Sequence, residues 1–306
     1  LGFAGGCGRR GCTRWHGMIL DSHQHVWDLT AADYPWLGPQ HHPINRTIEL
    51  ADAHEHMAAF GVQRTILVQA ADNAAETQHL LRVAKADPRV AGVVGWVPLD
   101  QPMLTTAMLA SRDRRWVGVR SLIHDRPSDE WILGCDEGLD ALAQAGVPLD
   151  YVTSSPWALR HVPGIAARHP QLRIVVDHLG KPPIGGSEHE LAAWRDLLEV
   201  CAAQRGVFAK VSGLYGPEGN LAGWRQEEVR SAVGTALEVF GPARLMWGSD
   251  WAVSELAGGY AQVTGGLIGL LREMLQGEDL AGVLGGVAAS FYAIELELEL
   301  NEEKSA

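Results

Sequence analysis

The chain has 306 residues, of which 46% are hydrophobic and 20% are charged, a balance typical of a soluble protein with a large core. It carries 37 acidic residues against 25 lysines and arginines, which gives a formal net charge of −12 at pH 7. Such a charge repels phosphate backbones and anionic bilayers, so we expect neither nucleic acid nor a membrane as a partner.

The first 17 residues contain two of the four cysteines and no apolar run of the kind that a secretory signal needs. We interpret residues 1–17 as an extension upstream of a natural start at Met18. The other two cysteines, Cys135 and Cys201, lie far apart in the sequence, so no disulfide framework is expected. Cysteines this few and scattered are typical of a reducing compartment, and they predict a cytoplasmic protein.

From Met18 onward, short apolar runs rich in β-branched residues alternate with longer amphipathic segments. The apolar runs predict eight strands, over residues 18–26, 64–70, 90–98, 116–124, 147–153, 172–180, 206–214 and 243–251. Helical periodicity is clear over residues 76–87, 138–146, 190–204 and 227–241. The longest uncharged apolar stretch, residues 280–294, is too short to span a bilayer and predicts a buried helix.

The strands recur about once every 25–35 residues, which is the length of one β-loop-α-loop unit. Eight such units predict an α/β protein with the (β/α)8 TIM-barrel fold, formed by a single domain over residues 18–296. An open doubly wound sheet would usually carry a glycine-rich turn after its first strand, and none follows residue 26. We expect residues 297–306 to form a polar tail.

The C-terminal ends of barrel strands converge on one mouth, where the catalytic groups of such enzymes lie. Six of the eight predicted strands end in polar residues, more than solvent exposure alone explains. These residues are, in chain order, His23 and His25, Arg120 and His124, Asp150 and Tyr151, Asp177 and His178, Lys210 and Ser212, and Ser249 and Asp250.

His23 and His25 are one residue apart at the end of the first apolar run. Because strand side chains alternate between faces, both imidazoles point the same way. Two imidazoles on one face can share a metal ion or bracket one polarised group of a substrate. The alternative is that the strand ends here and its histidines face solvent.

Several of these segments, taken in this order, resemble the amidohydrolase superfamily. They are most similar to the branch that hydrolyses sugar lactones, such as L-fuconolactone and L-rhamnonolactone, and 2-pyrone-4,6-dicarboxylate. The resemblance extends from Met18 to about Ile294. The segments that carry it are HQH (23–25), VVDHLGKP (175–182) and WGSDW (247–251), with DYPWL (33–37), VRSLIH (119–124) and KVSGL (210–214) in support.

The resemblance implies a barrel mouth that holds His23, His25, His178 and Asp250. Members with two metal ions also carry a histidine at the end of the fifth strand and often a bridging lysine on the fourth, and both are missing here. The four residues present suffice for one divalent ion, zinc or manganese, with an open position. Some members of the lactonase branch use no metal, so metal-independent catalysis is the alternative.

For lactone hydrolysis we assign Asp250 as the general base that takes a proton from water and returns it to the leaving oxygen. His178, His23 and His25 polarise the carbonyl directly or through the ion. A carboxylate is a weak base, so either burial must raise the pKa of Asp250 or a metal ion must acidify the water. The alternative is that Asp250 N-caps the next helix and that His178 satisfies a hydrogen bond in the core. Asp177 should point away from His178, and we assign it a supporting hydrogen bond.

The predicted substrate-binding residues are Arg120, His124, Tyr151, Lys210 and Trp27. Lys181 follows the sixth strand and faces either substrate or solvent. One clear arginine at the mouth and several tryptophans favour a neutral sugar aldonolactone over a dicarboxylated pyrone, which would need several guanidinium groups. Two alternatives are a metal-dependent decarboxylase of the same superfamily and a catalytically inactive barrel that binds a small ligand. Association into a homo-oligomer stays open.

Overall fold

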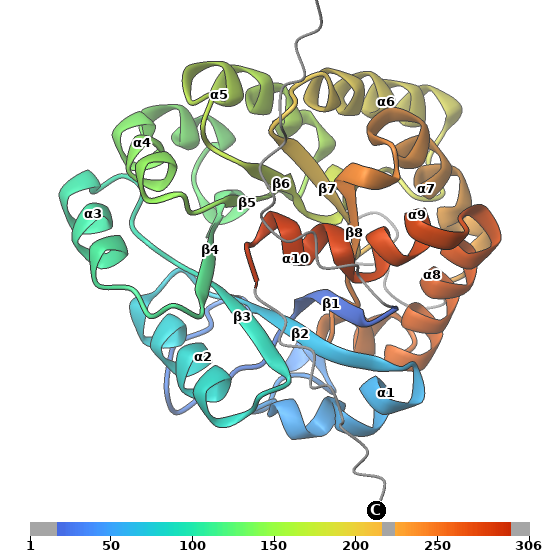
Figure 1. Ribbon diagram of the computed structural model, residues 1–306, viewed down its shortest axis with the longest axis horizontal. Coiled ribbons are helices and arrows are strands. Elements are labelled where there is room, and N and C mark those ends of the chain that lie inside the picture. Colours follow the sequence, from blue (N-terminus) through green and yellow to red (C-terminus); the bar gives the residue numbers. More distant parts are fainter. Residues whose placement is uncertain (1–16, 216–223, 295–306) are drawn as a thin grey trace, which may run out of the picture.

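The computed structural model describes residues 17–215 and 224–294, and it contains one parallel sheet of eight strands in the order β1 to β8. A bridge between Gln24 and Trp251 joins the first strand to the chain after the last and closes the barrel. The (β/α)8 prediction is therefore confirmed (Figure 1). The strands are β1 (Ile19–Gln24), β2 (Val62–Val68), β3 (Val90–Gly95), β4 (Trp116–Leu122), β5 (Leu149–Val152), β6 (Ile174–Val176), β7 (Val207–Val211) and β8 (Leu245–Trp247).

Helices surround the barrel, and the four that periodicity predicted begin and end within two residues of the expected positions. Local chemistry sets these ends. Ser187 and Glu190 form a capping box at the start of α6, and Gly146 ends α4 with a φ of 66°. The helices are α1 (His54–Ala59), α2 (Ala74–Ala86), α3 (Pro102–Ala110), α4 (Asp136–Ala145), α5 (Val162–Arg168), α6 (Glu188–Ala202), α7 (Gln226–Phe240), α8 (Tyr260–Met274), α9 (Gly277–Ala281) and α10 (Val287–Phe291).

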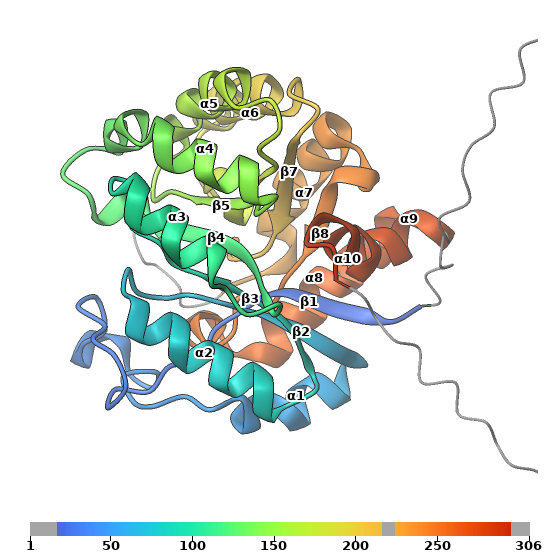
Figure 2. The ribbon, with the colours of Figure 1, turned by 60° about the vertical axis from the view of Figure 1, so that its left-hand side comes forward.

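The segment predicted as one buried helix over residues 280–294 is instead two short helices, α9 and α10. Between them, Gly282–Gly286 forms a π-helical segment that is interrupted at Gly285, because glycine weakens a helix more than any residue except proline. In Figures 1 and 2, α10 lies across one end of the barrel. None of the helices in the described ranges is both long enough and apolar enough to cross a bilayer. The predicted extension, except Gly17, and the predicted tail lie outside the described residues.

The interior of the barrel is apolar at the end that α10 covers. Burying each aliphatic or aromatic side chain there stabilises the fold by about 1.5–3 kcal/mol. Polar side chains occupy the opposite end of the interior, at the C-terminal ends of the strands. The apolar layer consists of Leu20, Ile66, Val68, Val94, Val175 and Met246 from the strands, and Ala288, Ala289, Phe291 and Tyr292 from the C-terminal segment.

We expect Gly138→Ala to lower the free energy of unfolding by about 1–3 kcal/mol, although alanine normally favours a helix. A Cβ at this position of α4 would lie 2.1 Å from the carbonyl oxygen of Leu99, so the helix would have to move. Gly234→Ala in α7 is the matched control, because a Cβ there meets nothing within 4 Å, and it should stabilise by about 0.5–1 kcal/mol. Urea unfolding measures both variants. Equal stability of the two would contradict the close approach of α4 to Leu99.

Candidate active site

The side chains of His23, His25, His178 and Asp250 meet at the mouth of the barrel. The Nε2 atoms of His23 and His25 lie 3.1 Å apart, and Oδ1 of Asp250 lies 3.3 Å from His25 Nε2 and 3.6 Å from His23 Nε2. The ring centroids of His23 and His178 lie 4.6 Å apart. No side chain caps the next helical turn, Val253–Ala257, so Asp250 is not an N-cap residue. The structure brings together the four residues that the sequence singled out.

Left-handed backbone turns aim two of these side chains. His178 has a φ of 55° and Asp250 a φ of 53°, and Leu179 and Lys181 are also left-handed. Residues other than glycine rarely adopt this conformation, so the surrounding contacts must hold it. The turn at His178 ends the strand alternation, and Asp177 and His178 therefore both contact the interior. The prediction that Asp177 points away from His178 was wrong for this reason.

Hydrogen bonds and a close glycine hold these turns. The Nδ1 atom of His178 lies 3.0 Å from the hydroxyl of Ser212. A Cβ on Gly213 would lie 2.3 Å from the same Nδ1, so no larger residue fits without moving the imidazole. The backbone N–H of Asp250 donates to the carbonyl of His23 at 2.9 Å. Contacts with the chain after β7 thus hold His178 in position, and a hydrogen bond to β1 holds Asp250.

A buried network of charges lies beneath His23. The ammonium of Lys210 donates to Asp150, and it lies 3.1 Å from Asp177 Oδ1 and 3.2 Å from His23 Nδ1. The Nη1 atom of Arg120 lies 3.3 Å from both Asp177 Oδ2 and His23 Nε2. Lys210, Asp150 and Asp177 are 0% exposed. Asp177 therefore has the supporting position that the sequence analysis assigned to it.

Two predicted substrate contacts, Tyr151 and Trp27, do not belong to the site. The hydroxyl of Tyr151 donates to the carbonyl of Ala158 at 2.8 Å, and the indole of Trp27 donates to the carbonyl of Arg46 at 2.6 Å. Both rings are fully buried in the core cluster outside the barrel. Strand alternation explains Tyr151, because its neighbour Asp150 occupies the interior face of β5.

The three other predicted substrate contacts lie in different places. Lys210 is fully buried and contacts His23 from beneath, so the structure places it as a supporting group. His124 lies in the turn Ile123–Asp125 with its side chain 30% exposed. Arg120 adjoins His23, and among the described residues its Nε has no hydrogen-bond partner. Substrate contact by His124 and Arg120 stays a prediction.

Sequence reasoning missed Tyr292, which follows α10 and reaches the network from the covered end of the barrel. Its hydroxyl donates to the two carboxylate oxygens of Asp150 at 2.9 and 2.8 Å. Tyr292 does not lie at the end of a strand, so the pattern of polar residues at strand ends does not include it. The available signal was a lone tyrosine within an otherwise apolar C-terminal stretch.

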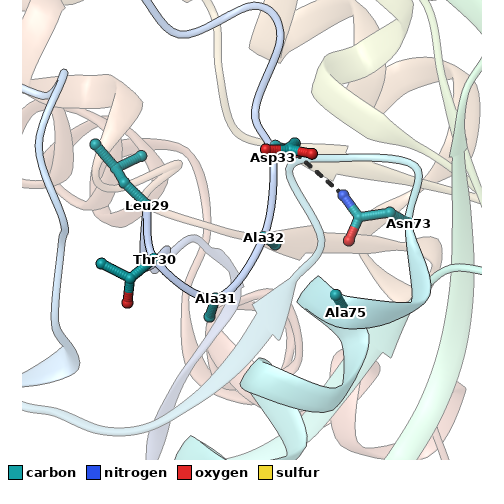
Figure 3. Close-up of a pocket in the computed structure, with 7 residues that line it drawn as sticks. All are labelled: Leu29, Thr30, Ala31, Ala32, Asp33, Asn73 and Ala75. Carbon is teal, nitrogen blue, oxygen red and sulfur yellow. Dashed lines mark hydrogen bonds between the residues drawn. The ribbon is translucent and has the colours of Figure 1, made fainter.

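A pocket of about 300 Å³ lies apart from these residues, between the loop after β1 and the start of α2 (Figure 3). The side chain of Asn73 donates to the carbonyl of Asp33 across it at 3.1 Å. None of the histidines and aspartates described above lines this pocket, so we do not assign it to the catalytic centre. Its lining residues are Leu29, Thr30, Ala31, Ala32, Asp33, Asn73 and Ala75.

Comparisons with known proteins identify the family. The amidohydrolase family model matches residues 20–294. The chain belongs to the amidohydrolase family. It is 35% identical to an L-fucono-1,5-lactonase of Burkholderia ambifaria, over 90% of this chain and 96% of that protein, and 34% identical to one of Burkholderia multivorans over the same shares. A crystal structure of an amidohydrolase from Burkholderia multivorans with bound zinc has a TM-score of 0.84 at 32% identity, covering 91% of this chain and all of that one.

The residues present fit the divalent ion that many amidohydrolases bind. The ligand atoms of His23, His25 and Asp250 lie within 4.8 Å of one another. Two imidazoles and one carboxylate are a donor set typical of catalytic zinc sites. The Nδ1 atom of His25 lies 2.7 Å from the carbonyl of Val68, which can only accept a hydrogen bond. The Nε2 atom of neutral His25 therefore carries the lone pair that a metal needs.

His23 can present either ring nitrogen as the acceptor. Its Nδ1 lies 3.2 Å from the donor Lys210 and 3.4 Å from the acceptor Asp177. When Nδ1–H donates to Asp177, Nε2 is free to bind an ion. His178 belongs to a second candidate group, with His23 and Asp177. The four predicted ligands therefore do not form one group, and the two groups share His23.

Burial sets the protonation of the site. It lowers the pKa of His23, His25 and His178 below the ordinary 6.5, so these imidazoles are neutral at pH 7. Burial alone would raise the pKa of Asp250, but interactions with His178, His25 and Lys181 outweigh it and lower the value to about 2. Asp250 is therefore ionised at neutral pH. Burial therefore does not make Asp250 a stronger base by raising its pKa. The other way to a competent base is a metal ion that acidifies the water.

We expect Lys210→Met to lower the free energy of unfolding by about 3–5 kcal/mol, because it leaves Asp150 and Asp177 buried without their shared cation. Urea unfolding measures this loss, and adding Asp150→Asn to the variant should recover part of it. Lys85→Met, on the exposed face of α2, is the control and should change stability by less than about 0.5 kcal/mol. Equal stability of the two single variants would show that the network does not stabilise the fold.

Proposed function

We propose that this amidohydrolase opens a sugar lactone, with L-fucono-1,5-lactone or an aldonolactone of similar shape as the substrate. The observation that carries the proposal is the contact between the ionised carboxylate of Asp250 and the neutral imidazole of His25, with His23 and His178 beside them. The similarity to two L-fucono-1,5-lactonases over nearly the whole chain supports the same reaction.

The chain supplies each group that lactone hydrolysis needs. Asp250 accepts the proton of the attacking water and returns it to the leaving ring oxygen. The neutral imidazoles of His178 and His23 lie where they can polarise the lactone carbonyl. Arg120, 3.3 Å from His23 Nε2, contributes positive charge next to the oxygen that becomes negative. His23, His25 and Asp250 would hold a zinc or manganese ion, which when bound supplies the positive charge that acidifies water.

The arginines near the mouth favour a neutral substrate. Arg120 is bonded to Asp177 and to the carbonyl of Gln69, and Arg126 is bonded to Asp72 and stacks over Trp131, 4.2 Å from its ring centroid. A dicarboxylate needs guanidinium groups that protein carboxylates do not already neutralise. An uncharged, hydroxylated lactone places no such demand on the site.

We expect Asp250→Asn to lower kcat/KM for the preferred aldonolactone by about 10²–10⁴-fold, because the amide cannot accept the proton of water. A pH-indicator assay over a panel of aldonolactones and 2-pyrone-4,6-dicarboxylate measures the loss, before and after chelation. Lys85→Met is the control and should retain full activity. If the wild type opens no lactone but binds a metal tightly, the decarboxylase alternative takes the place of this proposal. Neither turnover nor metal would favour an inactive barrel.

We expect the acid limb of the kcat/KM profile to lie below pH 6.5. The reaction needs neutral histidines and an ionised Asp250, and the pKa values of both kinds of group are lowered. As pH falls, the activity is therefore retained until these lowered values are reached. Initial rates between pH 4.5 and 8, measured in buffers of constant ionic strength, test this. An inflection at or above 6.5 would contradict the neutral, buried state of the histidines.

A further inference from the structure

Two hydrogen-bond donors on the β6 and β7 side of the mouth lack adequate partners. Lys181 follows β6 with a φ of 60°, and its ammonium makes a long contact of 3.5 Å to the carbonyl of Gly213. Among the residues that the structure describes, it forms no ion pair. The hydroxyl of Tyr215 is buried, forms no hydrogen bond of ordinary geometry within the described ranges, and interacts with the Asp250 carboxylate. The ammonium lies 5.8 Å from the centroid of the Tyr215 ring, so the two donors are neighbours.

Both donors lie beside the catalytic pair formed by His178 and Asp250. Gly213, whose carbonyl faces Lys181, packs directly against the imidazole of His178. Tyr215 follows two residues later, and its phenol lies close enough to Asp250 that, after burial, the carboxylate charge is what most raises the phenol's pKa. The chain after β6 therefore places an ammonium next to the general base, and the chain after β7 places a hydroxyl there.

Unpaired buried donors are costly, since each forgoes the hydrogen bonds it would make in water. Lys210, Arg120 and Asp177 near His23 are bonded to one another, whereas the described residues offer Lys181 only the long contact to the Gly213 carbonyl as an acceptor and Tyr215 only the neighbouring Asp250 carboxylate. An oxygen that becomes negatively charged during the reaction is the ligand that an ammonium and a phenol stabilise best. The arrangement thus points to a reacting oxygen of the substrate.

Resting on the proposed lactonase function, we propose that Lys181 Nζ and Tyr215 Oη donate hydrogen bonds to the ring oxygen of the lactone, the oxygen that leaves. Asp250 must reach both the attacking water and this oxygen, because it carries the proton from one to the other. His23 and His25 contact Asp250 directly, at 3.6 and 3.3 Å, and serve the carbonyl oxygen. The donors left beside Asp250 are Lys181 and Tyr215.

The step balances without a further reactant. Water adds to the carbonyl carbon and its proton passes to Asp250. The bond from this carbon to the ring oxygen then breaks, and the electron pair remains on the ring oxygen. Asp250 returns the proton to that oxygen, giving the hydroxy acid. Lys181 and Tyr215 keep their own protons and stabilise the oxygen by hydrogen bonds while the bond breaks.

The test compares leaving groups. We expect Lys181→Met to lower kcat/KM for an aldonolactone, whose leaving group is an alkoxide, by about 10²-fold. For dihydrocoumarin or 4-nitrophenyl acetate, whose leaving groups are phenoxides that need little stabilisation, the loss should be at least about tenfold smaller. Tyr215→Phe should show the same pattern with a smaller loss, and Lys181→Arg should retain part of the activity. A merely structural role would lower the rates with all substrates equally.

Oxygen exchange gives a second readout on the aldonolactone itself. In water enriched in oxygen-18, a slower departure of the ring oxygen lets the tetrahedral intermediate revert, so label enters the carbonyl of unreacted lactone. The ratio of exchange to hydrolysis should rise in Lys181→Met and stay unchanged in Lys85→Met. Equal losses with both leaving groups and an unchanged ratio would overturn the assignment. A wild type that hydrolyses no lactone would instead overturn the proposed function.

Discussion

Two aspartates share one lysine at the centre of the barrel, and the geometry of the candidate active site depends on this contact. Asp150 and Asp177 are buried where an isolated carboxylate would be strongly destabilised, so each is tolerated because Lys210 lies between them. The same ammonium lies against Nδ1 of His23. The position of His23 follows from the charges beneath it, and the contacts of His23 with His25 and Asp250 follow in turn.

The covered end of the barrel supports this network through one side chain. Phe291 and Tyr292 pack against the apolar layer formed by the strands, and the Tyr292 hydroxyl extends beyond that layer to Asp150. The Asp150 carboxylate thus receives hydrogen bonds from Lys210 and from the C-terminal segment. The closure of the barrel at one end is therefore coupled to the order of the site at the other.

Above the network, left-handed backbone turns rather than strands orient the side chains of His178 and Asp250. A strand places alternate side chains on opposite faces, so it cannot direct both Asp177 and His178 into the interior. The left-handed turn at His178 makes this possible, and Gly213 provides the space that the imidazole occupies. The short motifs VVDHLGKP and KVSGL are thus two halves of one packing arrangement, which explains why a glycine stands in the second.

The sequence by itself determined the eight β/α units, and it predicted the four residues His23, His25, His178 and Asp250 that the structure brings together at the mouth of the barrel. These follow from local periodicity, from the convergence of parallel strand ends and from motifs that resemble a known family. Tertiary structure decided which neighbouring polar residues reach the site. Tyr151 was misassigned because one residue of register moves a side chain to the other face of a strand. Lys210 was predicted to contact the substrate but lies beneath His23, because the sequence pattern does not show how deep along the barrel axis a side chain lies. Tyr292 was missed because it follows α10, 142 residues away from Asp150, and only packing brings the two together.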